Sequence, residues 1–207
     1  MMMKKTLLIA LLLSQTLFSQ EETTKKDRAF SFNHQLFFFL NNHTNFGDNF
    51  LSKANEPQFI GFGTQYNFIK YYDFKVGVGY DIMKYKVTDE SLAGNISTTN
   101  YSNLFLKIQY EYNLTPKWTV EPNISIGRPS IHQKTGQKSY GRFYGTSYSL
   151  GTNISYELMD HVAVFGGVNY NYSSFKVTTA KEYMDFFEKS NQIQVALGLI
   201  FSVQKKP

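Results

Sequence analysis

Hydrophobic and polar residues alternate with a period of two near the end of the chain. Every odd position from Ile193 to Val203 is apolar, while the even positions between them are mostly small or uncharged polar residues. Strict alternation over this length indicates a β-strand with two unlike faces. The segment therefore predicts the last strand of a sheet.

The same alternation recurs in seven earlier segments. With the last one, the predicted strands are residues 29–40, 58–68, 74–84, 101–114, 118–127, 144–158, 161–173 and 191–203. Strands of about 10–14 residues exceed the usual five or six of soluble sheets and match tilted membrane-spanning strands. The first segment is the least regular, because Phe37 and Phe39 fall on its more polar face.

The connections between these segments alternate in length. Short turns are expected near 69–73, 114–117 and 158–161, and long loops near 41–57, 85–100, 128–143 and 174–190. In an up-and-down meander this places all short turns at one rim and all long loops at the other.

The composition of the two faces indicates which side contacts lipid. The polar face is mostly Gly, Ser, Asn and Gln, which suits a narrow interior, whereas the other face is broad, aromatic and nearly free of charge. A soluble barrel would show an apolar interior and a charged exterior. Open sheet edges are not tolerated in hydrocarbon. The sequence therefore predicts an all-β fold, a single eight-stranded antiparallel up-and-down transmembrane β-barrel with short periplasmic turns and four long extracellular loops.

The first twenty residues are predicted to be a signal peptide. Lys4 and Lys5 precede an apolar run at 7–13 and a more polar end at 14–20. This is the layout of a secretory signal, and the run is too short to span a bilayer as a helix. The expected organisation is signal peptide 1–20, a short periplasmic segment 21–28, the barrel 29–203 and a C-terminal tail 204–207.

Composition adds three constraints. The 207 residues include no cysteine, so an exported chain would have no disulfide framework. The 15 Tyr and 19 Phe favour strands over helices. The formal net charge of +5 is mild, and in a membrane setting it gives no reason to expect a nucleic-acid partner.

Aromatic residues gather near both predicted rims, as two membrane interfaces would select. The set near the short turns is Tyr66, Tyr71, Tyr72, Tyr110, Tyr112, Trp118 and Tyr156, and the set near the long loops is Tyr80, Tyr85, Tyr101, Tyr144, Tyr170 and Tyr172.

This pattern, over residues 28–203, resembles the small outer-membrane β-barrels of Gram-negative bacteria, the eight-stranded OmpA/OmpX-like class. The Phe-Ser-Gln end of the signal and the Tyr/Asn/Phe-rich barrel are similar to those of Bacteroidetes. Alternation into Phe201 resembles the C-terminal assembly signal of the class, although this chain continues to Pro207. The resemblance implies Sec export, a cell outer-membrane location and contact with the barrel-assembly machinery.

Six charged residues are predicted to face the lumen as an ion-pair network: Lys75, Asp81, Lys107, Glu111, Glu121 and Glu157. Unpaired charges in a narrow interior are costly, so we expect Lys107 to pair with Glu121 and Lys75 with Glu111. The network is expected to act as a structural plug, with a gate or proton-linked path as the alternative.

The segment 128–142 carries cations and no acid. Its cations are Arg128, Lys134, Lys138 and Arg142. Guanidinium and ammonium groups bind phosphates well, so this loop is either a lipopolysaccharide contact or an ordinary solvated loop.

Some small barrels of this class modify lipid A, a reaction that needs catalytic side chains. A His–carboxylate–Ser set could be formed by His43, Asp89 and Ser91, and His43 with Glu56 only loosely matches a deacylase pattern. The other histidines lack metal-ligand spacing. We therefore expect no catalytic residue, metal or cofactor.

The sequence best fits a non-enzymatic structural or surface-interaction barrel with a side-chain-filled lumen. The alternatives are a narrow porin-like channel for small polar solutes or ions, a lipid A-modifying enzyme, and an accessory barrel of a secretion system. The expected partners are outer-membrane lipid, lipopolysaccharide and an unidentified surface or periplasmic protein.

Overall fold

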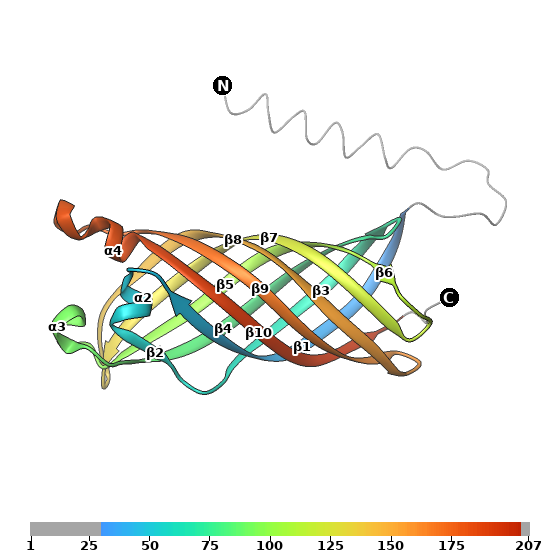
Figure 1. Ribbon diagram of the computed structural model, residues 1–207, viewed down its shortest axis with the longest axis horizontal. Coiled ribbons are helices and arrows are strands. Elements are labelled where there is room, and N and C mark those ends of the chain that lie inside the picture. The colour runs from blue at the N-terminus through green and yellow to red at the C-terminus, as the bar shows by residue number, and fades with distance from the viewer. Residues whose placement is uncertain (1–29, 204–207) are drawn as a thin grey trace, which may run out of the picture.

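Eight long antiparallel strands form a closed ring in the computed structural model, which describes residues 30–203 (Figure 1). The ring strands are β1 (Phe30–Phe46), β3 (Gly61–Tyr71), β4 (Phe74–Val87), β5 (Thr98–Tyr110), β7 (Trp118–Thr135), β8 (Lys138–Met159), β9 (Val162–Lys176) and β10 (Lys189–Ser202). Each strand pairs with the next in the chain, and β10 pairs with β1 over twelve residue pairs. The predicted eight-stranded up-and-down barrel is confirmed.

The line of directly paired residues follows a spiral around the ring. Directly paired residues followed from Gln35 once around the ring lead back to β1 at Asn45, ten positions along the strand. In barrels this stagger goes with a strand tilt of about 35–45°. Tilt explains why these strands need more residues than an upright strand to cross the same thickness.

Short elements lie between the ring strands. They are α2 (Phe50–Lys53), β2 (Asn55–Pro57), α3 (Glu90–Ala93), β6 (Tyr112–Asn113), the 3₁₀ helix η1 (Lys181–Tyr183) and α4 (Met184–Glu188). The helices gather at one end of the barrel, the loop end, while β1 begins and β10 finishes at the other, the turn end (Figure 1). Across residues 30–203, no helix is long and apolar enough to cross a membrane.

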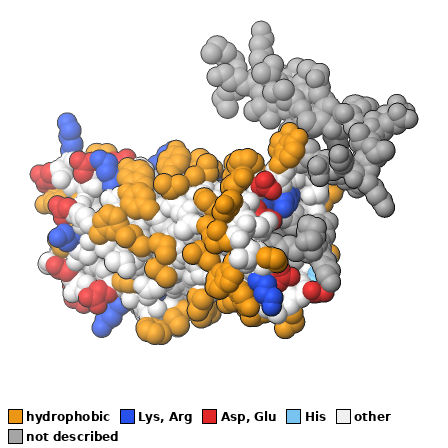
Figure 2. All heavy atoms as spheres, turned by 45° about the vertical axis from the view of Figure 1, so that its right-hand side comes forward, with side chains coloured by type: hydrophobic (Ala, Val, Ile, Leu, Met, Phe, Trp, Pro, Cys, Tyr) orange, Lys and Arg blue, Asp and Glu red, His pale blue; other side chains and the backbone are white. Residues whose placement is uncertain are grey.

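The middle of the outer surface is apolar. Leu40, Leu104 and Leu150 point outward and are 44–63% exposed. Figure 2 shows hydrophobic side chains covering the middle of the barrel, with charged side chains at the loop end. Inward positions are mainly buried Asn, Gln, Ser and Thr. The predicted assignment of the two faces is therefore confirmed.

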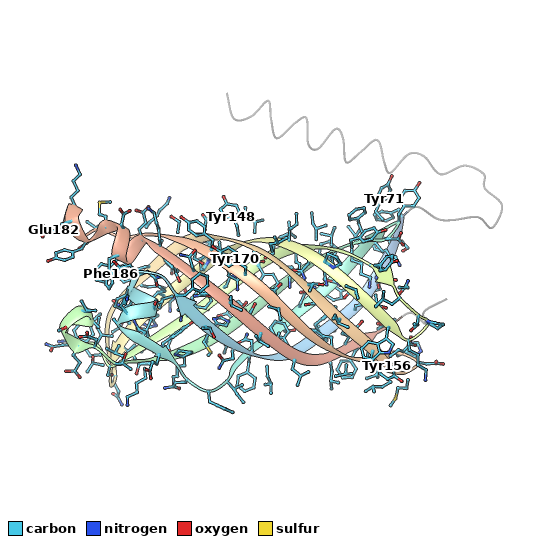
Figure 3. The ribbon with its side chains drawn as sticks, in the orientation of Figure 1. Tyr71, Tyr148, Tyr156, Tyr170, Glu182 and Phe186 are labelled. Atoms are coloured by element: carbon cyan, nitrogen blue, oxygen red, sulfur yellow. The ribbon has the colours of Figure 1, made fainter. Side chains whose placement is uncertain are left out.

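The aromatic residues follow the prediction with two exceptions. Those near the turn end lie at the surface, and Figure 3 shows Tyr71 and Tyr148 pointing away from the barrel. Tyr85 and Tyr101 were expected at the outer interface, but this was wrong, because odd-numbered residues of β4 and β5 face the lumen and both side chains are buried.

The strands extend further at the loop end than predicted. The segment 128–143 was expected to be a loop, but β7 runs to Thr135 and β8 begins at Lys138, so it is a β-hairpin with a two-residue turn. Gly136 enters that turn with φ of +58°, a conformation that glycine adopts without strain. Beyond the apolar band both strand faces can be polar, so alternation no longer marks the strands.

Three predicted parts of the chain, the signal peptide 1–20, the segment 21–28 and the tail 204–207, lie outside the described residues. The last described strand continues one residue past Phe201. The expected assembly signal remains a prediction.

Candidate functional sites in the lumen and on the outer surface

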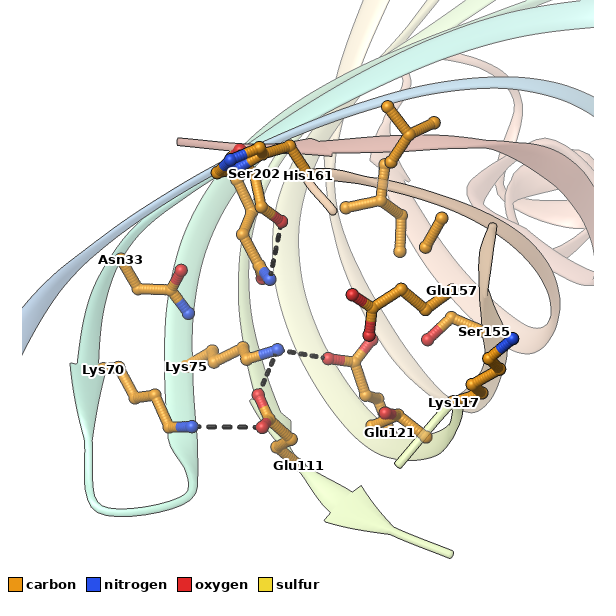
Figure 4. A pocket seen from close by; sticks show the side chains of 15 residues that line it. Asn33, Lys70, Lys75, Glu111, Lys117, Glu121, Ser155, Glu157, His161 and Ser202 are labelled. Atoms are coloured by element: carbon orange, nitrogen blue, oxygen red, sulfur yellow. Dashed lines mark hydrogen bonds and ion pairs between the residues drawn. The ribbon is translucent and has the colours of Figure 1, made fainter. Parts of the chain in front are cut away.

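An ion cluster occupies the lumen near the turn end. The ammonium of Lys75 pairs with Glu111 and lies 2.7 Å from Oε1 of Glu121, and Lys70 Nζ lies 3.1 Å from Oε1 of Glu111 (Figure 4). Lys75 and Glu121 are each 2% exposed. Burial makes each charge dependent on its partners, because a single buried charge left alone is strongly destabilising.

The predicted pair Lys75–Glu111 is confirmed, whereas the predicted pair Lys107–Glu121 is wrong. Lys107 lies opposite Ser125 on β7, two inward positions from Glu121, and Glu121 pairs with Lys75 instead. Sequence reasoning also missed Lys70. A register shift in β3 between Asn67 and Ile69 interrupts the alternation that would have assigned its face.

The remaining predicted lumen charges lie apart from this cluster. Asp81 is buried further toward the loop end, where Gln194 Nε2 lies 3.5 Å from its Oδ2. The Lys107 ammonium lies 5.2 Å from the ring centroid of Phe105, and Glu157 is half-buried at the turn end. The six predicted residues thus all line the lumen, and ion pairs among the described residues join three of them, Lys75, Glu111 and Glu121.

Aromatic side chains fill the lumen next to the ion cluster. Phe37 and Phe165 are buried with ring centroids 5.3 Å apart, and Ala196 and Ile200 complete their cluster. Phe39 packs against the same cluster. The only sequence signal for this layer was the irregular position of Phe37 and Phe39 in the first strand.

A buried polar group lies further toward the loop end. His43 Nδ1 lies 3.1 Å from the hydroxyl of Tyr85, and its Nε2 lies 3.1 Å from Nε2 of Gln194. The Tyr101 ring packs edge-on to the imidazole, with centroids 5.5 Å apart. His43 therefore acts as part of the lumen packing.

The structure does not bring the candidate catalytic residues together. His43 is 1% exposed inside the barrel, whereas Asp89 and Ser91 lie on the exposed surface at α3. Hydrogen bonds from the Ser91 hydroxyl and from the backbone amides of Ser91 and Leu92 lower the pKa of the Asp89 carboxyl, which caps the helix. Glu56 is likewise exposed, on β2. Within residues 30–203, no group of three His, Asp or Glu side chains could hold a metal ion.

The loop end of the lumen is closed by an apolar cluster. Phe50 and Leu51 of α2 pack against inward residues of the ring strands, namely Met83, Tyr85, Val87, Tyr101, Ile131 and Phe175. Phe186 and Phe187 of α4 cover this cluster, and the rings of Phe50 and Phe187 lie 5.1 Å apart. We call this cluster the mouth cluster.

The outer surface carries a one-sided charge pattern. The ring strands contain three carboxylates, Asp81, Glu121 and Glu157, and all three line the lumen. Outward-facing cations at the loop end follow directly where the apolar positions stop. Lys189 at the start of β10 also faces outward but pairs with Asp185 of α4. We call the others the cation collar: Lys84, Lys86, Arg128, Lys134, Arg142 and Lys176.

Strand register joins the collar across neighbouring strands. Lys84 lies opposite Asn100, Asn100 opposite His132, and His132 opposite Arg142. Directly paired residues share a sheet face, so this row runs over four strands on the outside. The Arg128 guanidinium lies 5.3 Å from the ring centroid of Tyr144, which holds it against the outer surface.

Three of the four predicted loop cations, Arg128, Lys134 and Arg142, belong to the collar. Lys138 lies at the tip of the hairpin opposite Thr135, with its ammonium 5.3 Å from the Tyr140 ring. Sequence reasoning missed Lys84, Lys86 and Lys176 because it considered a single loop. The sequence signal that could have identified them is a lysine at the outward positions that follow the last apolar residue of a strand.

No known family model matches the sequence, and neither does any curated protein. Solved structures do match. Neisserial surface protein A matches with a TM-score of 0.56 and 14% identity, covering 83% of this chain and 97% of that one.

Two further solved structures are outer-membrane proteins. AlkL, determined in lipid bilayers, matches with a TM-score of 0.52 and 12% identity over 92% of this chain and 99% of that one. OprG from Pseudomonas aeruginosa matches with a TM-score of 0.51 and 10% identity, over 84% of this chain and 97% of that one. With its ring of eight strands and apolar outer band, this chain has the fold of the small bacterial outer-membrane β-barrels.

Proposed function

We propose that this outer-membrane barrel has a structural or surface-interaction role and acts neither as a channel nor as an enzyme. The observation that carries the proposal is the filled lumen. The mouth cluster, the His43 group, the Phe37–Phe165 cluster and the Lys75 ion cluster follow one another from the loop end to the turn end.

The cost of opening this lumen supports the proposal. An eight-stranded barrel has an interior just wide enough for its own side chains. A solute would have to displace Leu51 and Tyr85, each no more than 1% exposed, and separate Lys75 from its two carboxylates. Breaking a buried ion pair alone costs about 3–5 kcal/mol.

Conductance in planar bilayers tests the closed barrel. We expect the purified full chain to give no steady single-channel current, because a conducting path would have to pass the buried side chains of these four layers. Steady current that changes in Lys75→Ala but not in the outward control Lys84→Ala would establish a lumen pathway and contradict the proposal.

The non-enzymatic part of the proposal rests on the position of His43. Both of its ring nitrogens lie within 3.1 Å of lumen side chains, and Asp89 and Ser91 contact each other at the surface. Among the described residues, no observation favours the role of an accessory secretion barrel. Insertion by the barrel-assembly machinery is supported by the aromatic Phe201 near the end of β10.

We further propose that the cation collar contacts phosphate groups of lipopolysaccharide in the outer leaflet. The collar lies where the apolar band ends, at the level of lipid headgroups. Arg and Lys bind phosphate through charge-assisted hydrogen bonds. The outward faces of the ring strands carry no carboxylate that would compete for these cations.

Neutralising the collar should weaken lipopolysaccharide binding. In the triple variant Lys84→Gln, Arg128→Gln, Arg142→Gln we expect at least tenfold weaker retention, because each hydrogen bond to a charged group contributes about 1.5–3 kcal/mol. Native mass spectrometry of bound lipid A measures this.

The matched control removes three cations outside the collar, in Lys53→Gln, Lys138→Gln, Lys181→Gln. It should retain the lipid, and both proteins should bind dephosphorylated lipid A equally. If the two triple variants lose the lipid to the same extent, net charge rather than the collar is responsible and the proposal is wrong.

A further inference from the structure

A polar cavity of about 110 Å³ opens at the turn end of the lumen (Figure 4). The ion cluster forms one wall, and residues of β8, β9, β10 and β1 form the others. The cavity lies at the opposite end of the barrel from the mouth cluster and the cation collar. Neither proposed role uses it.

One carboxylate on the cavity wall does not take part in the ion pairs of the lining residues. Lys70 and Lys75 are matched by Glu111 and Glu121 through the ion pairs described above. Among residues 30–203, the half-buried Glu157 side chain has no ion-pair or hydrogen-bond partner. On the β8 wall, the cavity therefore has a carboxylate that no ion pair of the described residues uses.

The exposed cation Lys117 contacts an outward aromatic ring. The ammonium of Lys117 lies 5.9 Å from the ring centroid of Tyr156, a residue of the outer face. Lys117 also lines the cavity, but none of the ion pairs of the described residues joins it to Glu157, whose carboxylate points into the cavity (Figure 4). The charge is thus directed toward a ligand.

Two further polar side chains face the cavity without protein partners in the described part of the chain. Asn33 of β1 is 8% exposed and Ser155 of β8 is 7% exposed. Ser155 and Glu157 are successive inward positions of one strand, whereas Asn33 lies on the facing wall (Figure 4). Buried polar groups are normally hydrogen-bonded, so these positions are suited to a bound polar molecule.

Part of the cavity wall is apolar. Ala163 and Ile200 line the cavity from β9 and β10. They offer a contact for methylene groups between a charged head at Glu157 and a polar group at Asn33.

We propose that this cavity binds a primary alkylammonium with a polar group at its other end, the chemistry of a lysine side chain. The ammonium forms an ion pair with Glu157 and donates a hydrogen bond to the Ser155 hydroxyl. The methylenes contact Ile200, and Asn33 hydrogen-bonds the polar end. An ammonium has three donors and no acceptor, which matches a carboxylate and a hydroxyl oxygen.

An anion or a divalent metal ion fits this cavity less well. Of the three lysines that line the cavity, Lys70 and Lys75 are already paired with carboxylates, and the Lys117 ammonium lies over the Tyr156 ring. Calcium takes six to eight oxygen ligands, whereas Glu157 is the one carboxylate of the cavity wall that is free of a lysine among the described residues.

Calorimetric titration of the full chain in nanodiscs tests the proposal. The probe is Nα-acetyl-lysine amide, and the matched probe is the same molecule acetylated at Nε, which has lost its charge. We expect the charged probe to bind at least tenfold more tightly. Equal affinity of the two probes, or full competition by KCl at the probe concentration, would overturn the proposal.

Variants locate the site on the protein. Glu157→Gln should weaken binding of the charged probe at least tenfold, while Glu182→Gln, the same substitution at the loop end, should leave it unchanged. Binding that persists in folded Glu157→Gln would overturn the assignment. Cadaverine distinguishes the source of the ligand: affinity equal to that of the lysine probe assigns the site to small diamines, and weaker affinity assigns it to lysine side chains.

This site is independent of the closed barrel and of the cation collar. A steady conductance or an inactive collar would leave the lysine titration unchanged, and failure of the titration would leave both earlier proposals standing.

Discussion

At the scale of single residues, glycines make room for the aromatic side chains of the lumen. A Cβ added to Gly63 would lie 2.2 Å from ring atoms of Phe39, and one added to Gly198 would lie 2.7 Å from the Phe39 Cβ. Phe39 is thus held between two strands that cannot carry side chains there. Gly79 makes room for Phe105 in the same way.

Gly63→Ala should destabilise the barrel by about 1–3 kcal/mol, the usual cost of overpacking. The free energy of unfolding by urea in lipid vesicles measures this. The matched control is Gly166→Ala, whose Cβ would meet nothing nearer than a carbonyl oxygen at 3.9 Å. Phe39→Leu should restore part of the loss. Equal stability of the two alanine variants would show that the Phe39 ring is not confined.

Sequence reasoning succeeded at this scale where the alternation is regular. It placed Lys75 and Glu111 on the inner face, and their pairing followed. It failed for Lys107 and Glu121 because the pairing partner depends on the register between strands, which alternation within one strand does not contain. Tyr85 and Tyr101 were placed at the outer interface because they are tyrosines. Their odd sequence numbers put them on the inner face of their strands.

At the scale of elements, the strands could be predicted within the apolar band but not beyond it. The period-two signal depends on one face being in lipid and the other in the lumen. The hairpin of β7 and β8 continues past this region, so its residues lose the signal while the hydrogen-bonded pairing persists. The 22 residues of β8 make it the longest strand described.

The short helix α2 could not be predicted from local pattern either. Its four residues are too few for a helical period. Asn49 caps the helix by accepting a hydrogen bond from the Ser52 backbone amide at 3.0 Å. The buried Phe50 and Leu51 hold it in the mouth cluster. Tertiary contacts, rather than helix propensity, therefore stabilise this element.

At the scale of the whole molecule, the ring is closed by the pairing of its first and last strands. This seam was the weakest part of the sequence prediction, because the first strand was irregular. The structure places Phe37 and Phe39 in the lumen and keeps Phe38 and Leu40 outside. The irregularity thus reflects aromatic packing inside the barrel rather than a break in the strand.

Cysteine pairs across the seam test its register. Asn42 and Val195 are directly opposite, and paired residues have Cα atoms about 4.5–5.5 Å apart, within reach of a disulfide. The chain has no native cysteine, so Asn42→Cys with Val195→Cys should cross-link cleanly under oxidation.

The offset pair Asn42→Cys with Leu197→Cys is the control. Diagonal neighbours lie about 7–8 Å apart and should cross-link poorly. Non-reducing electrophoresis of unfolded protein measures both yields. A higher yield from the offset pair would mean that the strands close with a different register.

Closure of the ring also determines how the barrel responds to force. A sheet with an edge strand can be unzipped one hydrogen bond at a time from that edge, but here β1 and β10 are paired and no ring strand offers a starting point. A force applied to a surface loop is therefore distributed over all the interstrand hydrogen bonds of a tilted strand and acts on them in shear. The pairing that completes the fold thus also makes the barrel resistant to extraction by a force on its loops.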